Sequence, residues 1–201
     1  MSQDIAASVA LARRMLTVAP LDVAGAAKLA AAAAAEGSGE AAYVMAALNA
    51  AGGAVPQSWR SALEWLTRAA ELEHEAARQE LAVLAEAPSV TAAIDRKETP
   101  ESWESLRKSI DVRRWLMPPA PRPAHADLPI ALVEKFISPA IAAWLIEKAR
   151  PNCRRAQIDD AATGQAQYAA VRTNTFADFP LPDSGVVLHL LRARIAACVG
   201  S

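Results

Sequence analysis

The string RTNTFADF at residues 172–179 is the most specific stretch of the chain, and the elements expected around it decide the fold. Residues 130–136 are expected to form a strand, because Ile130 and Leu132 alternate with Ala131 and Val133 and turn residues bound the segment. Turn-forming residues at 159–164 separate two further expected strands, one near residues 154–158 and one near residues 167–175. The last third of the chain is therefore expected to contribute strands to a sheet.

Two helices are expected to flank these strands. Ser138 can cap and Pro139 can open a helix that ends before Pro151. The expected buried stripe of this helix consists of Ile141, Trp144, Leu145 and Ala149. Asp183 or Ser184 can cap the last helix. Its expected buried residues are Leu188, Leu191, Ile195 and Cys198.

The first half of the chain repeats itself. The string AAEGSGEAA at residues 34–42 recurs as AAELEHEAA at residues 69–77, an offset of 35 residues, whereas Asp22 aligns with Ser58 at an offset of 36. We therefore expect two helix pairs with a one-residue slip in a turn, preceded by a lone capping helix at residues 3–16.

The second repeat unit predicts its helices most clearly. Ser58 can cap a helix whose apolar face consists of Trp59, Ala62, Leu63, Leu66 and Ala70. A second helix is expected at residues 75–86, with Ala77, Leu81 and Leu84 on its stripe. His74 is expected to be a helix-start or surface residue.

The repeat pattern stops at Ala87. A further helix is expected at about residues 100–110, with Thr99 as its cap and Pro100 at its first position. The proline-rich string MPPAPRPAHADLP at residues 117–129 predicts an extended connector. We therefore expect three parts, a helical repeat region at 1–88, a helix and linker at 89–126, and a strand-containing part at 127–201.

Composition narrows the class of protein. Of the 201 residues 53% are hydrophobic and only 5% aromatic, which favours a helix-rich chain. A formal net charge of −1 argues against nucleic-acid binding and against attraction to an anionic membrane. Cys153 and Cys198 are too few for a disulfide framework, and no apolar run suits a signal peptide or membrane span. We expect a soluble, cytoplasmic protein.

The run GGAVPQSWRSALEWLTRAA at residues 52–70 resembles the Sel-one-like repeat, a relative of the tetratricopeptide repeat. Five residues match that pattern, namely Val55, Ala62, Trp65, Ala69 and Ala70. Ser58 stands where the pattern has aspartate, and Ala54 replaces one glycine. The resemblance implies an α–α repeat solenoid that binds a protein or peptide partner. A packed helical lid without a partner is the ordinary alternative.

Four blocks of sequence, in this order, resemble prolyl 4-hydroxylase-type oxygenases. They are VEKFISPAIAAWLIEKARP at 133–151, DDAATG at 159–164, RTNTFADF at 172–179 and VVLHLLRARIAACVG at 186–200. The resemblance implies an α+β, mostly α chain in which the solenoid precedes the incomplete start of a double-stranded β-helix, or jelly-roll, oxygenase domain. The implied parent is a 2-oxoglutarate and Fe(II) dependent dioxygenase that hydroxylates a prolyl or similar peptide side chain, with ascorbate as a further candidate cofactor.

The family's iron ligands are a His, an Asp two residues later and a distant second His, and a basic residue beyond them binds 2-oxoglutarate. Three ligands on one face leave open positions for the oxoacid and for oxygen. No residue of this chain matches these positions, so we expect an inactive N-terminal fragment without catalytic, cofactor-binding or metal residues. Arg172, Thr173 and Asn174 match the family's string and are expected to form a strand and a pocket wall.

A second set of residues imitates the iron triad. His125 and Asp127 form an H-x-D, and His189 follows with Arg192 and Arg194 beyond it. We interpret this pattern as a coincidence, because the first histidine lies in the connector rather than on a rigid strand. The second histidine is expected to be solvated on the polar side of the last helix.

Other catalytic motifs are absent from the sequence, including G-x-S-x-G, a Walker loop, a dinucleotide glycine fingerprint and C-x-x-C. The alternative to an oxygenase fragment is a helical-repeat interaction module that carries a degenerate oxygenase-like remnant. The sequence does not identify the substrate of the parent enzyme or the partner of the repeats.

Overall fold

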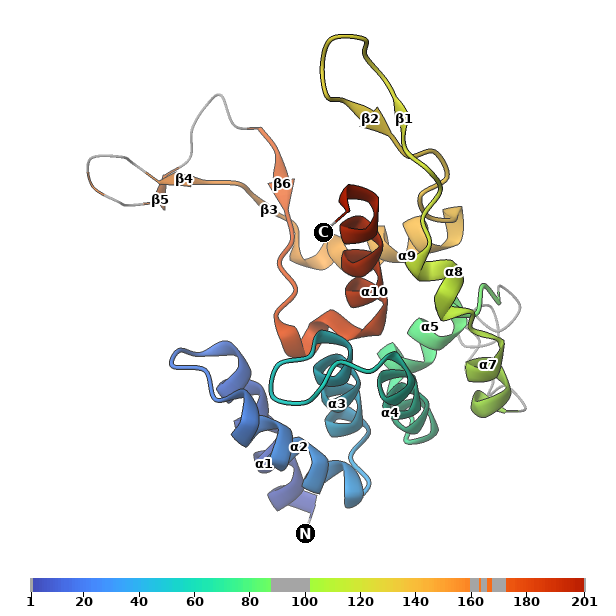
Figure 1. Cartoon of the computed structure of the whole chain (residues 1–201). Coiled ribbons are helices and arrows are strands. Elements are labelled where there is room, and N and C mark those ends of the chain that lie inside the picture. The colour runs from blue at the N-terminus through green and yellow to red at the C-terminus, as the bar shows by residue number, and fades with distance from the viewer. Residues whose placement is uncertain (1, 88–101, 160–162, 164–165, 168–172, 201) are drawn as a thin grey trace.

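The computed structural model describes residues 2–87, 102–159, 163, 166–167 and 173–200, which are mostly helical with a few short strands (Figure 1). This agrees with the expected α+β, mostly α class. The helices are α1 (Ser2–Thr17), α2 (Val23–Ala35), α3 (Gly39–Ala51), α4 (Trp59–Glu71), α5 (Glu75–Leu84), α7 (Trp103–Ser109), α8 (Val112–Leu116), α9 (Pro139–Ala149), the 3-10 turn η1 (Arg150–Asn152) and α10 (Leu181–Val199).

The first five helices comprise a leading helix and two helix pairs. Asp22 and Ser38 cap the helices of the first pair through their side chains, and Ser58 and His74 cap those of the second. Both sets of caps lie 36 residues apart, so the expected one-residue slip is wrong. The offset of 35 arose because alanine-rich sequences align nearly as well when they are shifted by one residue. The capping residues mark the helix boundaries and give the offset of 36.

Helix α3 lies at the centre of the core, and its residues 41–50 are all buried. It packs against α2, α4 and α10 (Figure 1). Its many alanines allow these neighbours to approach closely. The stripe expected on α5 is buried, and that on α4 is buried except for the half-buried Trp59. The buried residues are Ala62, Leu63, Leu66, Ala70, Ala77, Leu81 and Leu84.

Helices α7 and α8 connect the helical core to the later part of the chain. The Ser102 hydroxyl caps α7, which begins at Trp103 and therefore later than expected. The expected cap, Thr99, and Pro100 lie outside the described residues. Helix α8 was not expected. Trp103 and Trp115 are buried in the same cluster as α4 and α5, so this segment is part of the core.

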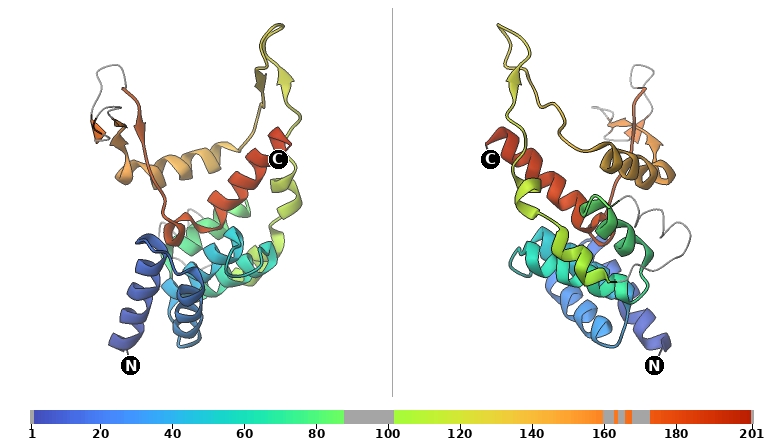
Figure 2. Two further views of the ribbon diagram at one scale, coloured as in Figure 1. Left: turned by 60° about the vertical axis from the view of Figure 1, so that its left-hand side comes forward. Right: turned by 90° about the vertical axis from the view of Figure 1, so that its right-hand side faces the viewer.

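The described strands are two residues long and form three separate antiparallel pairs. β1 (Arg122–Pro123) pairs with β2 (Ala131–Leu132), β3 (Arg154–Arg155) with β6 (Thr175–Phe176), and β4 (Ile158–Asp159) with β5 (Ala166–Gln167). The strand expected at 130–136 is shorter, and the proline-rich connector supplies its partner. The two strands expected around the turn at 159–164 do pair. All three pairs project from the same side of the helical body (Figure 1, Figure 2).

Helix α9 begins as expected, with Ser138 accepting from the Ile141 amide and Pro139 at its first position. Its expected stripe is buried only at Ile141, and Trp144 and Leu145 are half-buried. Within the described part of the chain, no helix combines the length and the apolar character needed to cross a membrane.

Helix α10 differs most from expectation. Pro180 precedes it, and neither Asp183 nor Ser184 caps it, because the helix is interrupted at Gly185 (φ +59°) and starts again at Val186. Of the stripe expected on this helix, Leu191 is buried, whereas Leu188 and Cys198 are half-buried. The buried apolar residues of the restarted part are Val186, Val187, Leu190 and Leu191. The side chain of Ile195, expected to be buried, is 54% exposed.

Candidate functional site

The most unusual group in the core is the carboxylate of Glu80, which is fully buried on α5. Its Oε1 atom accepts a hydrogen bond from the Tyr43 hydroxyl (2.7 Å). Its Oε2 atom accepts from the backbone amides of Val186 (2.8 Å) and Val187 (3.4 Å). The Lys148 ammonium group of α9 lies 3.7 Å from Oε1. One side chain therefore joins α3, α5, α9 and α10.

The interruption in α10 explains why a carboxylate is needed there. Restarting the helix at Val186 leaves amide groups without an intrahelical acceptor. Glu80 supplies that acceptor and places a negative charge at the positive end of the restarted helix. At Gly185 a Cβ atom would overlap the Glu80 carboxylate. The absence of a side chain at this position therefore allows the two elements to meet.

Burial shifts the pKa values of this cluster. Desolvation raises the pKa of Glu80 above its ordinary value, opposed by Lys148, Tyr43 and the two amides. Burial, followed by the nearby charge and hydrogen bond of Glu80, raises the pKa of the Tyr43 hydroxyl. The Tyr43 ring also stacks on His74, with ring centroids 4.5 Å apart. Burial lowers the pKa of that histidine, which is consistent with its role as a hydrogen-bond acceptor.

His189 lies in the interior, so its expected solvent exposure is wrong. It is 6% exposed, and its Nε2 atom lies 2.8 Å from the Ser184 hydroxyl. The interruption at Gly185 turns His189 inward and places the serine within hydrogen-bonding distance. Burial, followed by the charge of Arg192, lowers the pKa of His189 to about 4.

The structure does not assemble the imitation triad. His125 lies exposed in the loop between β1 and β2, where its Nδ1 atom accepts from the Asp127 amide (3.1 Å). His189 is buried in α10 against Ser184. In the described residues, no group of three His, Cys, Asp or Glu side chains is placed to hold a metal ion. These residues therefore do not fit an iron site.

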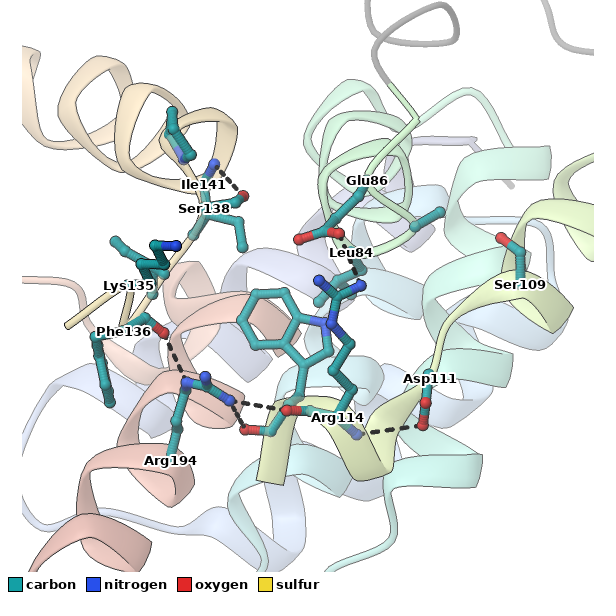
Figure 3. Close-up of a pocket in the computed structure, with 14 residues that line it drawn as sticks. Leu84, Glu86, Ser109, Asp111, Arg114, Lys135, Phe136, Ser138, Ile141 and Arg194 are labelled. Carbon is teal, nitrogen blue, oxygen red and sulfur yellow. Dashed lines mark hydrogen bonds and ion pairs between the residues drawn. The ribbon is translucent and has the colours of Figure 1, made fainter. Parts of the chain in front are cut away.

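A pocket of about 450 Å³ lies where α5, α8, α9 and α10 meet (Figure 3). Its apolar wall consists of Leu84, Trp115, Phe136, Ile137 and Ile141. Its charged wall consists of Glu86, Asp111, Arg114, Lys135 and Arg194. The pocket combines an apolar body with several charged groups, as small-molecule sites commonly do.

The end of the string at 172–179 lines a second pocket, of about 440 Å³, through Asp178 and Phe179. Thr173 and Asn174 are exposed and line neither of these two pockets. Arg172 lies outside the described residues. The backbone of Asn174 does take part in the strand pairing, because its carbonyl accepts from the Ala156 amide (3.0 Å).

Comparison of the chain with protein-family models, with curated proteins and with solved structures returned no match. The structure itself therefore supplies the information about the site. Sequence reasoning missed Glu80, Gly185 and Arg194 as organising residues. A signal existed for the first of these, because Glu80 follows Ala77 by three residues on the stripe expected to be apolar.

Proposed function

We propose that this chain is the N-terminal part of a 2-oxoglutarate and Fe(II) dependent dioxygenase of the prolyl 4-hydroxylase type, acting on a peptidyl side chain. The observation that carries the proposal is the order of the four sequence blocks across residues 133–200. The iron-ligand core is not among the residues of this chain. No step of the reaction is therefore assigned to them, and their role is to build and hold one side of the oxygenase domain.

The arrangement of the four blocks supports this role. Helix α9 leads into β3, β4 and β5 follow, and β6 returns beside β3 before α10 begins. Arg154 joins the two strands, because its guanidinium pairs with Asp178 and lies over the Phe176 ring. Residues 175–178 of the string therefore contact β3, which follows the first block in the sequence.

Exposed apolar residues give a second line of support. Large side chains are exposed on the β1–β2 segment, on α9 and on α10, namely Leu128, Ile130, Leu132, Ile146, Ile195 and Val199. Among the described residues each strand pairs with one other strand, and proteins normally cover the remaining edges of such pairs. Further strands that complete a jelly-roll sheet would cover the exposed apolar side chains and the strand edges.

The test is turnover by the protein extended through the coding sequence that follows Ser201. The extended protein, supplied with Fe(II), ascorbate and a proline-containing peptide, should convert 2-oxoglutarate to succinate and hydroxylate the peptide. The 201-residue chain should show no stoichiometric binding of Fe(II) by calorimetry, and none of 2-oxoglutarate that depends on Fe(II). Tight one-to-one binding of Fe(II) to this chain, or no 2-oxoglutarate turnover by the extended protein, would count against the proposal.

The alternative is a helical-repeat interaction module that carries an oxygenase-like remnant. One observation bears on where its partner would bind. Val186, Val187 and Leu190 of α10 lie in the same core cluster as α3, α4 and α5, so the chain itself fills that face. A partner must therefore use another surface. A pull-down with the whole chain that recovers no specific protein would argue against this alternative.

A further inference from the structure

Arg194 is a buried cation without a carboxylate partner. The residue is only 9% exposed, and its guanidinium forms no ion pair within the described part of the chain. Its Nε atom donates to the Phe136 carbonyl (2.8 Å), and Nη1 donates to the carbonyls of Arg114 (2.8 Å) and Trp115 (2.7 Å). These neutral acceptors and the Phe136 ring, whose centroid lies 5.2 Å from the guanidinium carbon, contact the group, but no carboxylate of the described residues pairs with it.

The remaining guanidinium nitrogen, Nη2, has no hydrogen bond to the described residues, and the side chain of Arg194 lines the 450 Å³ pocket (Figure 3). The two carbonyls on α8 are at its C-terminal end, where backbone acceptors lack intrahelical partners. They hold the guanidinium in one orientation. A rigid fork with a remaining donor is suited to binding a carboxylate or a phosphate.

A second cation lines the same pocket. Lys135 is exposed, forms no ion pair with a described residue and sits at a backbone φ of +53°. The other charges of the wall are already engaged. Glu86 pairs with Arg114 (3.1 Å), and Asp111 caps α8 by accepting from the Arg114 amide (3.2 Å). Arg114, Lys135 and Arg194 outnumber the two carboxylates, so the wall of the pocket keeps a net positive charge.

The shape of the wall indicates what accompanies the negative group. Trp115, Phe136 and Ile141 contribute apolar side chains to the pocket that Arg194 and Lys135 also line. The volume of about 450 Å³ lies in the range of small-molecule sites. A free inorganic anion would leave this apolar surface uncovered, whereas an anion with an aromatic or aliphatic body would cover it.

We propose that this pocket binds a small organic anion, with its carboxylate or phosphate against Arg194 and Lys135 and its apolar body against Trp115 and Phe136. The site is independent of the oxygenase proposal, because all of its residues lie in this chain. Binding would join α8, the segment before α9 and α10 through one ligand.

The test follows the indole N–H signal of Trp115 in nitrogen–proton correlation spectra of the whole chain, identified with Trp115→Phe. The probes are benzoate and phenyl phosphate, with benzyl alcohol as the uncharged counterpart. We expect a saturable one-to-one shift with at least one anion and none with the alcohol. A response to benzoate alone identifies a carboxylate site, and a response to phenyl phosphate alone identifies a phosphate site.

The decisive variant is Lys135→Asn, because asparagine tolerates a positive φ and Lys135 does not hold the fold together. It should weaken binding about tenfold, the effect of losing one ion pair in a partly buried site. Lys28→Gln removes an exposed lysine on α2 and should leave binding unchanged. The proposal is overturned if neither anion gives a saturable shift, if the alcohol binds as well, or if Lys135→Asn binds as tightly as the unaltered chain.

Discussion

Replacing Glu80 with alanine should lower the free energy of unfolding by about 3–5 kcal/mol, the usual cost of breaking a buried, hydrogen-bonded charge cluster. The substitution removes the acceptor of the Tyr43 hydroxyl and of the Val186 and Val187 amides. Each buried donor left without an acceptor costs about 1–3 kcal/mol. Lys148 loses its partner as well, but its side chain is 18% exposed and can reach water.

Glu80→Gln separates charge from shape. The amide keeps one acceptor oxygen for the restarted helix but presents an NH₂ group to Tyr43 or Lys148. It should therefore cost less than alanine, about 1–3 kcal/mol. Glu64→Ala is the matched control, because this glutamate lies exposed on α4 and should change stability by less than about 0.5 kcal/mol.

The assay is urea unfolding of the whole chain at pH 7, followed by circular dichroism at the helical band and by tryptophan fluorescence. Coincident transitions would show that the helical core and α10 unfold together. A loss below about 1 kcal/mol for Glu80→Ala would refute the view that this carboxylate joins the two parts.

Three further predictions use the same assay. Gly185→Ala should destabilise the chain by several kcal/mol, since its Cβ would overlap the Glu80 carboxylate, whereas Gly200→Ala, which has a positive φ but open space, should cost only about 1–2 kcal/mol. An equal loss in both would show that backbone strain alone matters. Burial lowers the pKa of His189 to about 4 from an ordinary 6.5, so the unfolded chain binds the proton first and stability should fall as pH drops through this window. His189→Gln should remove that fall and His125→Gln, in an exposed loop, should not. Burial raises the pKa of Glu80 above 4.5, so its contribution has the opposite sign: stability falls as pH rises from 4.5 toward the raised pKa, and Glu80→Gln should abolish this dependence. A pH profile that Glu80→Gln leaves unchanged would contradict the assigned shift.

The local signals of the sequence located most helices correctly. Ser58 and Ser138 cap the helices that they were expected to cap, because an N-cap depends only on residues within one turn. The apolar stripes of α4 and α5 are also largely buried as expected, since burial of an amphipathic helix follows its own periodicity.

The last helix could not be predicted in this way. Its register depends on the interruption at Gly185, and the acceptor for its restarted end comes from Glu80, 106 residues earlier than Val186. A rule that considers neighbouring residues selects Asp183 or Ser184 as the cap instead. The same interruption carries His189 inward. The pocket likewise depends on Arg194 reaching carbonyls of α8, a contact 79 and 80 residues apart in sequence.

We propose that residues 133–200 are the first part of an iron and 2-oxoglutarate dependent oxygenase domain. The most direct measurement is the sequence of the reading frame beyond Ser201 in the source gene. We expect an H-x-D motif followed by a distant His and, after it, a basic residue. A continuing frame without that set of residues would contradict it.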